Sequence, residues 1–294
     1  MHRDHREDSA RVHQGINFNQ TGERTQGQMV QCPRLRRHAP RGMYFQRMIL
    51  MKLPFQSWVC ATLVLILASS AVEAQDEMRD VVDQQMSWYM LFGNHRLTDQ
   101  LGLHTEYQFR RTGLGADWQQ SLLRVGLDWH RDDQYVVTGG YGWIRSFPYG
   151  EQPIGETFDE HRIWQQLITT SQTGALKWMH RYRLEQRLMM RESGRAWQHR
   201  ARYFVQVTWP IPNHPKWSLS AYEEAFIGLR ALENPVRNLL QQNRLSVALN
   251  HKIEGGTALQ LGYLQQALWK GSGLTAERNH VLLVGVRHNL DFRD

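Results

Sequence analysis

Apolar and polar residues alternate strictly along the segment 101–110, LGLHTEYQFR. Its odd positions are mostly apolar, from Leu101 to Phe109, and its even positions include Glu106 and Arg110. Successive side chains of a strand point to opposite faces, whereas a helix would spread both sets around its circumference. The segment is therefore predicted to be a β-strand with one apolar face and one charged face.

The same alternation returns along the chain and predicts eleven strand-like segments. Most are about 10 to 15 residues long, which exceeds the usual strand of about five or six residues. A tilted strand that crosses a membrane needs about 9–11 residues, so the lengths favour a transmembrane barrel over a soluble sandwich. The segments cover approximately residues 84–95, 101–112, 118–130, 134–145, 160–171, 175–190, 197–209, 216–227, 241–252, 256–269 and 279–292.

The connections between these segments alternate in length. Those after the first, third, fifth, seventh and ninth segments are short, while Ser146–Asp159 and Gly228–Leu240 are long. Short turns at one end and longer loops at the other are typical of up-and-down barrels, with the long loops extracellular.

Eleven strands would place the start of the chain on the wrong side, because bacterial single-chain barrels usually have an even number. We therefore predict an all-β, up-and-down antiparallel transmembrane barrel of about 12 strands (10–12), without a helical domain. Residues 75–83 would supply part of a twelfth strand; if instead one of the eleven segments is not a strand, there would be ten.

Residues 48–74 have the features of a secretory signal peptide. Lys52 supplies a positive charge, Trp58–Ala68 is apolar, and Val72–Ala74 fits a small-residue cleavage site that would leave Gln75 first. The apolar run is too short for a spanning helix of about 20 residues. Residues 1–47 lack any hydrophobic period and are either disordered or the product of a mis-called upstream start codon. Residues 75–294 would then form a single barrel domain, exported to the cell outer membrane.

Removing residues 1–74 changes the charge of the protein. The whole chain has 35 basic and 28 acidic residues, a net charge of +7, but the mature part keeps 25 and 23, a net of +2. The basic balance is therefore mostly a property of the leader, and nucleic-acid binding is not expected. Both cysteines, Cys32 and Cys60, also lie in the leader, so the mature domain cannot be held by disulfides.

Charged residues at period two identify the face that would line the lumen. An Arg or Lys on the lipid face costs about 2–4 kcal/mol at mid-membrane, so the apolar face must look out and the charged face in. Aromatic residues near the segment ends, Trp88 among them, would form interfacial girdles. The predicted lumen-facing residues are Glu106, Arg110, Arg124, Asp128, Glu160, Arg162, Arg181, Arg183, Glu185, Arg187, Arg200, Arg202 and Arg244.

Two interpretations of this charged lumen remain open. Arg and Glu can pair across neighbouring strands and fill the interior as a structural ladder. Alternatively, an Arg-rich wall can line a pore that favours anions, or hold an anionic ligand. The expected partners are outer-membrane lipids, the barrel-assembly machinery and small anionic solutes.

Several segments carry a resemblance to a known family. SWYMLFGNHRLTDQLGLHTEYQFR (87–110), LLRVGLDW (122–129), HRYRLEQR (180–187) and RARYFVQVTWPI (200–211) resemble the bacterial domain-of-unknown-function family 2490. The likeness covers nearly all of residues 83–292. The resemblance implies an outer-membrane barrel-like protein without an assigned activity, and it carries over no catalytic residues.

Enzyme chemistry has little support in the sequence. After Gln75 there is no His-x-Ser pair of the kind that a lipid hydrolase at the membrane rim would use, and no metal-binding spacing of His and Glu. We therefore expect a porin-like, structural or weakly channel-forming protein that is not an enzyme and has no cofactor. The alternatives are a membrane-rim lipid-modifying enzyme and a soluble periplasmic β-protein that binds a ligand.

Overall fold

The described part of the protein consists of β-strands of the predicted kind, joined by turns and loops. The computed structural model describes residues 80–151, 153–229, 239–269 and 275–293, which contain eleven strands and no helix that is long and apolar enough to span a membrane. The predicted leader segments 1–47 and 48–74 lie outside these residues. The strands are β1 (Asp80–Arg96), β2 (Leu101–Thr112), β3 (Trp118–His130), β4 (Tyr135–Ser146), β5 (Phe158–Thr173), β6 (Leu176–Arg191), β7 (Gly194–Pro210), β8 (Trp217–Gly228), β9 (Leu240–Lys252), β10 (Thr257–Trp269) and β11 (Thr275–His288).

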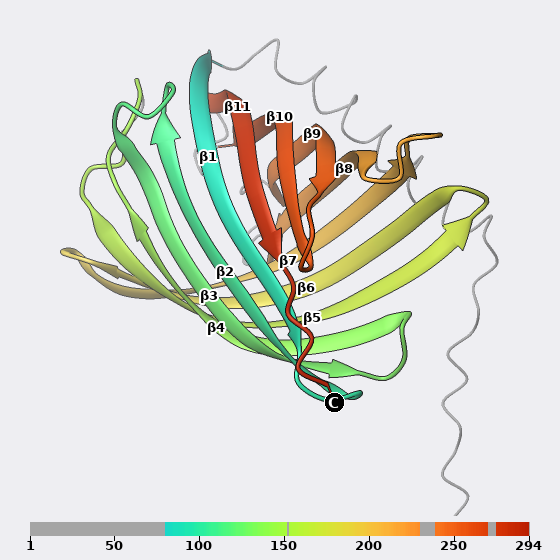
Figure 1. Cartoon of the computed structure of the whole chain (residues 1–294). Helices are drawn as coiled ribbons and strands as arrows, with labels where there is room; N and C mark the ends of the chain where they lie inside the picture. Colours follow the sequence, from blue (N-terminus) through green and yellow to red (C-terminus); the bar gives the residue numbers. More distant parts are fainter. Residues whose placement is uncertain (1–79, 152, 230–238, 270–274, 294) are drawn as a thin grey trace, which may run out of the picture. The chain divides into compact units, whose positions relative to one another are not determined.

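The strands close into one barrel in sequence order, which confirms the predicted up-and-down all-β fold (Figure 1). Each strand pairs antiparallel with the next one in the chain, and β1 closes the barrel by pairing in parallel with β11. This parallel pair runs from Asp80↔Thr275 to Phe92↔Arg287. Because β1 and β11 run in the same direction, the described strands close with eleven and need no twelfth. Residues 80–83, expected to belong to an additional strand, lengthen β1 instead, and 75–79 lie outside the described residues.

The two ends of the barrel differ in their connections. One end, called here the turn end, carries the short connections 97–100, 131–134, 174–175, 211–216 and 253–256. The other, called the loop end, carries the connection between β4 and β5. The β6–β7 connection, also at the loop end, has only two residues, Glu192 and Ser193.

The last strand ends earlier than the sequence pattern predicts. β11 stops at His288, opposite Thr257, because its partner β10 begins there. The prediction of a strand as far as residue 292 was therefore wrong. The tail instead follows β1: the Arg96 amide donates to the Leu290 carbonyl at 2.8 Å, and the Phe292 amide donates to the Arg96 carbonyl at 2.8 Å.

Each strand presents one face outward and one into the barrel. On β3 the outward residues Leu123, Val125 and Leu127 are 45%, 44% and 66% exposed, while Leu122 and Arg124 on the other face are buried. The period of two thus separates an apolar outer surface from a mostly polar interior, as expected.

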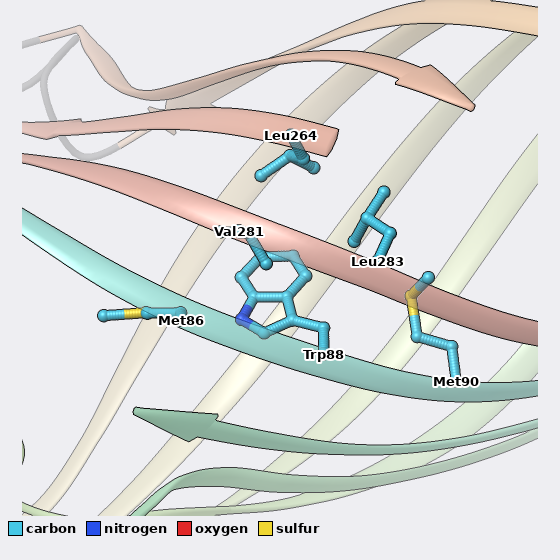
Figure 2. Close-up of a cluster of buried hydrophobic side chains, with 6 residues drawn as sticks. All are labelled: Met86, Trp88, Met90, Leu264, Val281 and Leu283. Carbon is cyan, nitrogen blue, oxygen red and sulfur yellow. The ribbon is translucent and has the colours of Figure 1, made fainter. Parts of the chain in front are cut away.

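The interior is apolar where the barrel closes. Met86, Trp88 and Met90 of β1 pack with Leu264 of β10 and with Val281 and Leu283 of β11 (Figure 2). All six are at most 8% exposed. The rule that the charged face looks in therefore fails for the middle of these strands, and the placement of Trp88 in an interfacial girdle was wrong. Both faces of residues 86–92 are apolar, so parity cannot tell which face turns inward; pairing with β11 decides it.

A glycine on β4 makes room for a second interior tryptophan. A Cβ atom at Gly140 would lie 2.5 Å from Trp164 Cζ2 and 2.3 Å from the Val125 carbonyl oxygen. Trp164 of β5 is fully buried there. The bare backbone of Gly140 therefore lets the indole lie flat against the inner wall.

Candidate functional site in the arginine-rich lumen

The structure places all thirteen predicted lumen residues on inward-facing strand positions. They come from β2, β3, β5, β6, β7 and β9, and eleven of them are buried. The side chains of Arg181 and Arg187 keep 21% and 14% of their surface exposed. Nine of the thirteen are arginines, and most of them meet in one continuous network.

Glu185 lies at the centre of this network and is fully buried. Its carboxylate accepts hydrogen bonds from Arg200 Nη2 at 2.5 Å and from Arg202 Nη1 at 2.7 Å. Three further guanidinium groups approach it within 3.8–4.0 Å, from the side chains of Arg124, Arg162 and Arg183. One carboxylate therefore offsets part of the charge of five arginines, so the region around it remains positively charged.

Three other carboxylates, those of Glu160, Glu106 and Glu224, also accept hydrogen bonds from arginines of the network. Glu160 accepts hydrogen bonds from Arg162 and, at 2.6 Å, from Arg187 Nε. Glu106 accepts one from Arg124 Nη1 at 2.6 Å.

Glu224 bridges three strands. It accepts hydrogen bonds from Arg181 Nη2 at 2.8 Å, from Arg202 Nη2 at 2.5 Å and from Arg244 Nη1 at 3.3 Å. Glu224 was not among the predicted lumen residues, because Glu223 beside it leaves the charged face of this strand ambiguous in the sequence.

Arg110 and Arg183 are held mainly by neutral groups. Arg110 donates to Gln108 Oε1 at 2.7 Å and to Gln120 Oε1 at 3.0 Å. Arg183 donates to Gln166 Oε1 at 2.6 Å. Among the nine arginines, Arg110 has no carboxylate of the described residues within 4.0 Å, so its charge is the least compensated.

Aromatic rings make cation–π contacts with several of these guanidinium groups. The Cζ atoms of Arg110 and Arg244 lie 3.8 Å and 4.8 Å from the ring centroid of Trp88, and Arg183 Cζ lies 4.6 Å from that of Trp164. Such cation–π contacts are favourable, more so when the groups are desolvated. Neither aromatic residue was predicted to line the lumen, although Trp164 has the parity of Arg162 and could have been assigned to the lumen from it.

Two further buried carboxylates, those of Asp128 and Glu277, accept hydrogen bonds from hydroxyl groups. Asp128 accepts a hydrogen bond from Thr138 Oγ1 at 2.5 Å. Glu277, which the sequence analysis did not single out, accepts one at 3.0 Å from the hydroxyl of Tyr149 in the β4–β5 loop. Burial and the neighbouring Glu277 carboxylate raise the pKa of Tyr149, so this hydroxyl remains a donor.

Three cavities follow one another along the interior. The loop-side cavity has a volume of about 230 Å³ and is lined by Tyr149, Glu160 and Phe226, among others. The middle cavity, about 310 Å³, is lined by Trp88 and Glu106, among others. The turn-side cavity, about 180 Å³, includes residues near the turn end of the barrel. The first two share Arg110, Arg124, Arg202 and Arg244 as lining residues, and the last two share Phe92, Gln206, Gln260 and Arg287.

The walls of the two larger cavities are strongly cationic. Seven arginines and one carboxylate, Glu160, line the loop-side cavity. Seven arginines and two carboxylates, Glu106 and Glu224, line the middle cavity. In the part of the chain that the structure describes, no group of three or more His, Asp or Glu residues is arranged to hold a metal ion. The arrangement suits anions.

Comparison with known proteins gives one family match. The family model described as "Protein of unknown function (DUF2490)" matches residues 85–277. No curated protein matches the chain.

Two solved porin structures are similar to parts of the chain. The structure described as "NanC porin structure in rhombohedral crystal form" is 12% identical, with a TM-score of 0.39, over 64% of this chain and 90% of that one. The "Anion-selective porin from Comamonas acidovorans" is 10% identical, with a TM-score of 0.32, over 63% of this chain and 55% of that one.

Proposed function

The chain belongs to the DUF2490 family of proteins of unknown function, and we propose that it is an outer-membrane β-barrel whose Arg/Glu-lined lumen forms a weakly conducting channel for small anions. The observation that carries this proposal is the series of three cavities along the interior, in which each cavity shares lining residues with the next. The residues shared by the loop-side and middle cavities are all arginines.

The outer surface of the barrel supports a membrane location. Leu127, Leu245 and Leu261 point outward and are 66%, 56% and 58% exposed. A contiguous apolar surface of this kind is unfavourable in water but suits the hydrocarbon core of a bilayer. A soluble periplasmic protein would leave it uncovered.

Exposed tryptophans lie near both ends of the barrel. Trp129, Trp209 and Trp217 are near the turn end, and Trp118 and Trp197 are near the loop end. Trp is enriched at both membrane–water interfaces because its ring is amphipathic. Together with the predicted signal peptide, the two belts favour the outer membrane.

The arginine network supports weak, anion-preferring conduction. Arginines that line a narrow path lower the barrier for anions and raise it for cations. The side chains of Arg124 and Arg202 are also tied to buried carboxylates, so they narrow the path while they hold the wall together. Structural pairing and slow permeation are thus two consequences of the same contacts.

No catalytic role is part of the proposal. The partners that it implies are outer-membrane lipids, the machinery that inserts barrels and small anionic solutes. Lipid contacts are assigned to the outward apolar face, and solute contacts to the lumen.

The first test is the location of the protein. The expected result is recovery in the outer-membrane fraction, with gel migration that changes on heating. Recovery in the soluble periplasmic fraction would contradict the membrane assignment.

The second test is conduction across planar bilayers. A KCl gradient should give small unitary currents with a reversal potential displaced toward that of chloride. Arg183→Gln should reduce this preference, because Arg183 lines the middle cavity. Arg145→Gln is the matched control: Arg145 lies at the loop end of β4, is exposed and pairs with Asp159 at 3.8 Å. Equal permeability for the two ions in the wild type would contradict the proposal.

A further inference from the structure

The loop-side cavity has an excess of positive charge that its own carboxylates do not offset. Of its seven arginines, Arg162 and Arg187 share Glu160, the single acid in its wall. The other five reach only carboxylates outside the wall, or none. A buried cavity with this composition lowers the energy of an anion placed inside it.

Arg110 presents a guanidinium group whose present partners are replaceable. Its three hydrogen bonds go to the neutral amide oxygens of Gln108 and Gln120. Gln120 itself lines the loop-side cavity. Carboxylate and phosphate oxygens form stronger, bidentate hydrogen bonds with arginine than amide oxygens do. An anion that displaced the Gln120 amide would therefore gain from the exchange.

Arg124 adds a second, independent observation. Its side chain is 4% exposed and donates through Nη1 to Glu106. Its Nε atom is buried and has no hydrogen-bond partner. Buried donors normally have partners, and an unpartnered one costs free energy. Arg124 lines the loop-side cavity, so a small turn of its side chain would let this donor bind a ligand there.

The same cavity has apolar walls as well as charged ones. Leu122, Phe158, Phe226 and Leu268 are among its lining residues. These side chains favour a ligand with a carbon skeleton over a bare inorganic ion.

The described residues of the β4–β5 loop, 147–151 and 153–157, contribute to the wall of this cavity. Tyr149 and Ile154 line it, and the Tyr149 hydroxyl donates to Glu277 inside the barrel. Gly150 has a φ of 68°, and a Cβ atom there would lie 2.1 Å from Gln84 Oε1. Only glycine lets the loop approach β1 this closely, and the approach leaves Tyr149 and Ile154 at the wall of the cavity.

We propose that the loop-side cavity is a binding site for a small organic anion with two or more carboxylate or phosphate groups. Arg110 and Arg124 bind its acidic groups, and Phe226 and Phe158 contact its carbon skeleton. The site deepens the proposed function and rests on it for the route by which the ligand arrives.

The site is tested by calorimetric titration of the folded full chain in detergent. The probes are citrate, fructose 1,6-bisphosphate and acetate, at matched ionic strength. We expect one citrate or one bisphosphate per chain, bound at least about tenfold more tightly than acetate. Tighter citrate binding assigns carboxylate chemistry, and tighter bisphosphate binding assigns phosphate chemistry. Equally weak binding of all three probes would overturn the proposal.

Two variants of Arg110 and one control locate the site. Arg110→Gln should weaken binding of the preferred probe about tenfold or more, while Arg110→Lys, which keeps the charge but loses the planar fork, should weaken it less. Arg145→Gln is the control, because Arg145 is exposed at the loop end of β4 and lines neither of the two larger cavities. Unchanged binding in a folded Arg110→Gln protein, shown by its heat-dependent gel migration, would overturn the placement of the site.

Binding and conduction are measured separately, so the two proposals can fail separately. Anion-selective currents without binding would remove the site and leave the channel. Binding without currents would remove the channel and leave the site.

Discussion

The inner wall of the barrel has two regions that are stabilised in different ways. Where β10, β11 and β1 meet, the wall is apolar, with Leu264, Leu283 and Met86 packed together. Over β2, β3 and β5 to β9 it carries the arginines and glutamates of the network, such as Glu185. Trp88 joins the two regions, since it packs in the apolar cluster and lies under Arg110 and Arg244.

The comparison shows how stability depends on context in the two regions. Each apolar side chain contributes about 1.5–3 kcal/mol when it is buried, largely whatever its neighbours. A buried charge contributes only while its partner is present, and removing the partner costs more than the pair contributed. At the seam between β1 and β11, a substitution therefore costs what the lost side chain contributed, whereas in the charged region it also costs the free energy of leaving a buried charge without its partner.

The largest predicted effect is that of Glu185→Gln. It leaves Arg200 and Arg202 without their central carboxylate, and we expect it to lower the free energy of unfolding by about 3–5 kcal/mol. Urea titration of the heat-dependent gel shift measures this. Glu192→Gln, in the exposed β6–β7 turn, is the control and should change little. A stable Glu185→Gln protein would show that the buried arginines do not depend on this carboxylate.

Leu264→Ala tests the apolar region directly. It opens a cavity beside Trp88 and should cost about 2–5 kcal/mol in the same assay, with anion selectivity in bilayers unchanged. Leu261→Ala, on the outward face of the same strand, opens no interior cavity and should cost less. A change of selectivity in Leu264→Ala would contradict the separation of the two regions.

Tyr149→Phe tests the contact between the β4–β5 loop and Glu277. Loss of this hydrogen bond should cost about 1 kcal/mol at neutral pH. Because the pKa of Tyr149 is raised on folding, its contribution is full below the unfolded pKa of about 10 and is lost at higher pH. The difference between the wild type and Tyr149→Phe should therefore shrink above that pH. A difference that grows with pH would mean that this hydroxyl does not act as a buried donor.

The smallest effect on stability is expected for Arg110→Gln. No described carboxylate is left unpaired by this change, so unfolding should shift by no more than about 1 kcal/mol. Anion selectivity should nevertheless fall, because Arg110 lines both large cavities. A large loss of stability would indicate that the Arg110–Trp88 contact holds the two regions together.

The sequence predicts the strands and their faces because alternation is local. Residues 101–112 and 118–130 were placed with their observed bounds, and the parity of Arg183 and Glu185 put both side chains inside. Pairing partners were not predictable in the same way. Which arginines share Glu185 depends on the register of β6 against β7 and on reach across the lumen, and neither is encoded in a single strand.

Closure of the barrel was also beyond local reasoning. Residues 86–92 are apolar on both faces, so nothing within the strand reveals that Met86 and Trp88 turn inward. The assumption of an even strand number led to a twelfth strand, which was needed to start and end the barrel on the same side of the membrane. The barrel instead closes by the parallel pairing of β1 with β11. These two strands lie far apart in the chain, so no local pattern predicts that they pair.

The parallel seam has a consequence for rearranging the order of the strands. The chain enters β1 at the loop end and leaves β11 at the turn end. A circular permutant that joins His288 to Asp80 must return along the full height of the seam, which is about 40 Å for thirteen paired residues at about 3.3 Å each. A tight two-residue linker would suffice in an even-stranded barrel, whereas here the linker must be a segment of at least about a dozen residues.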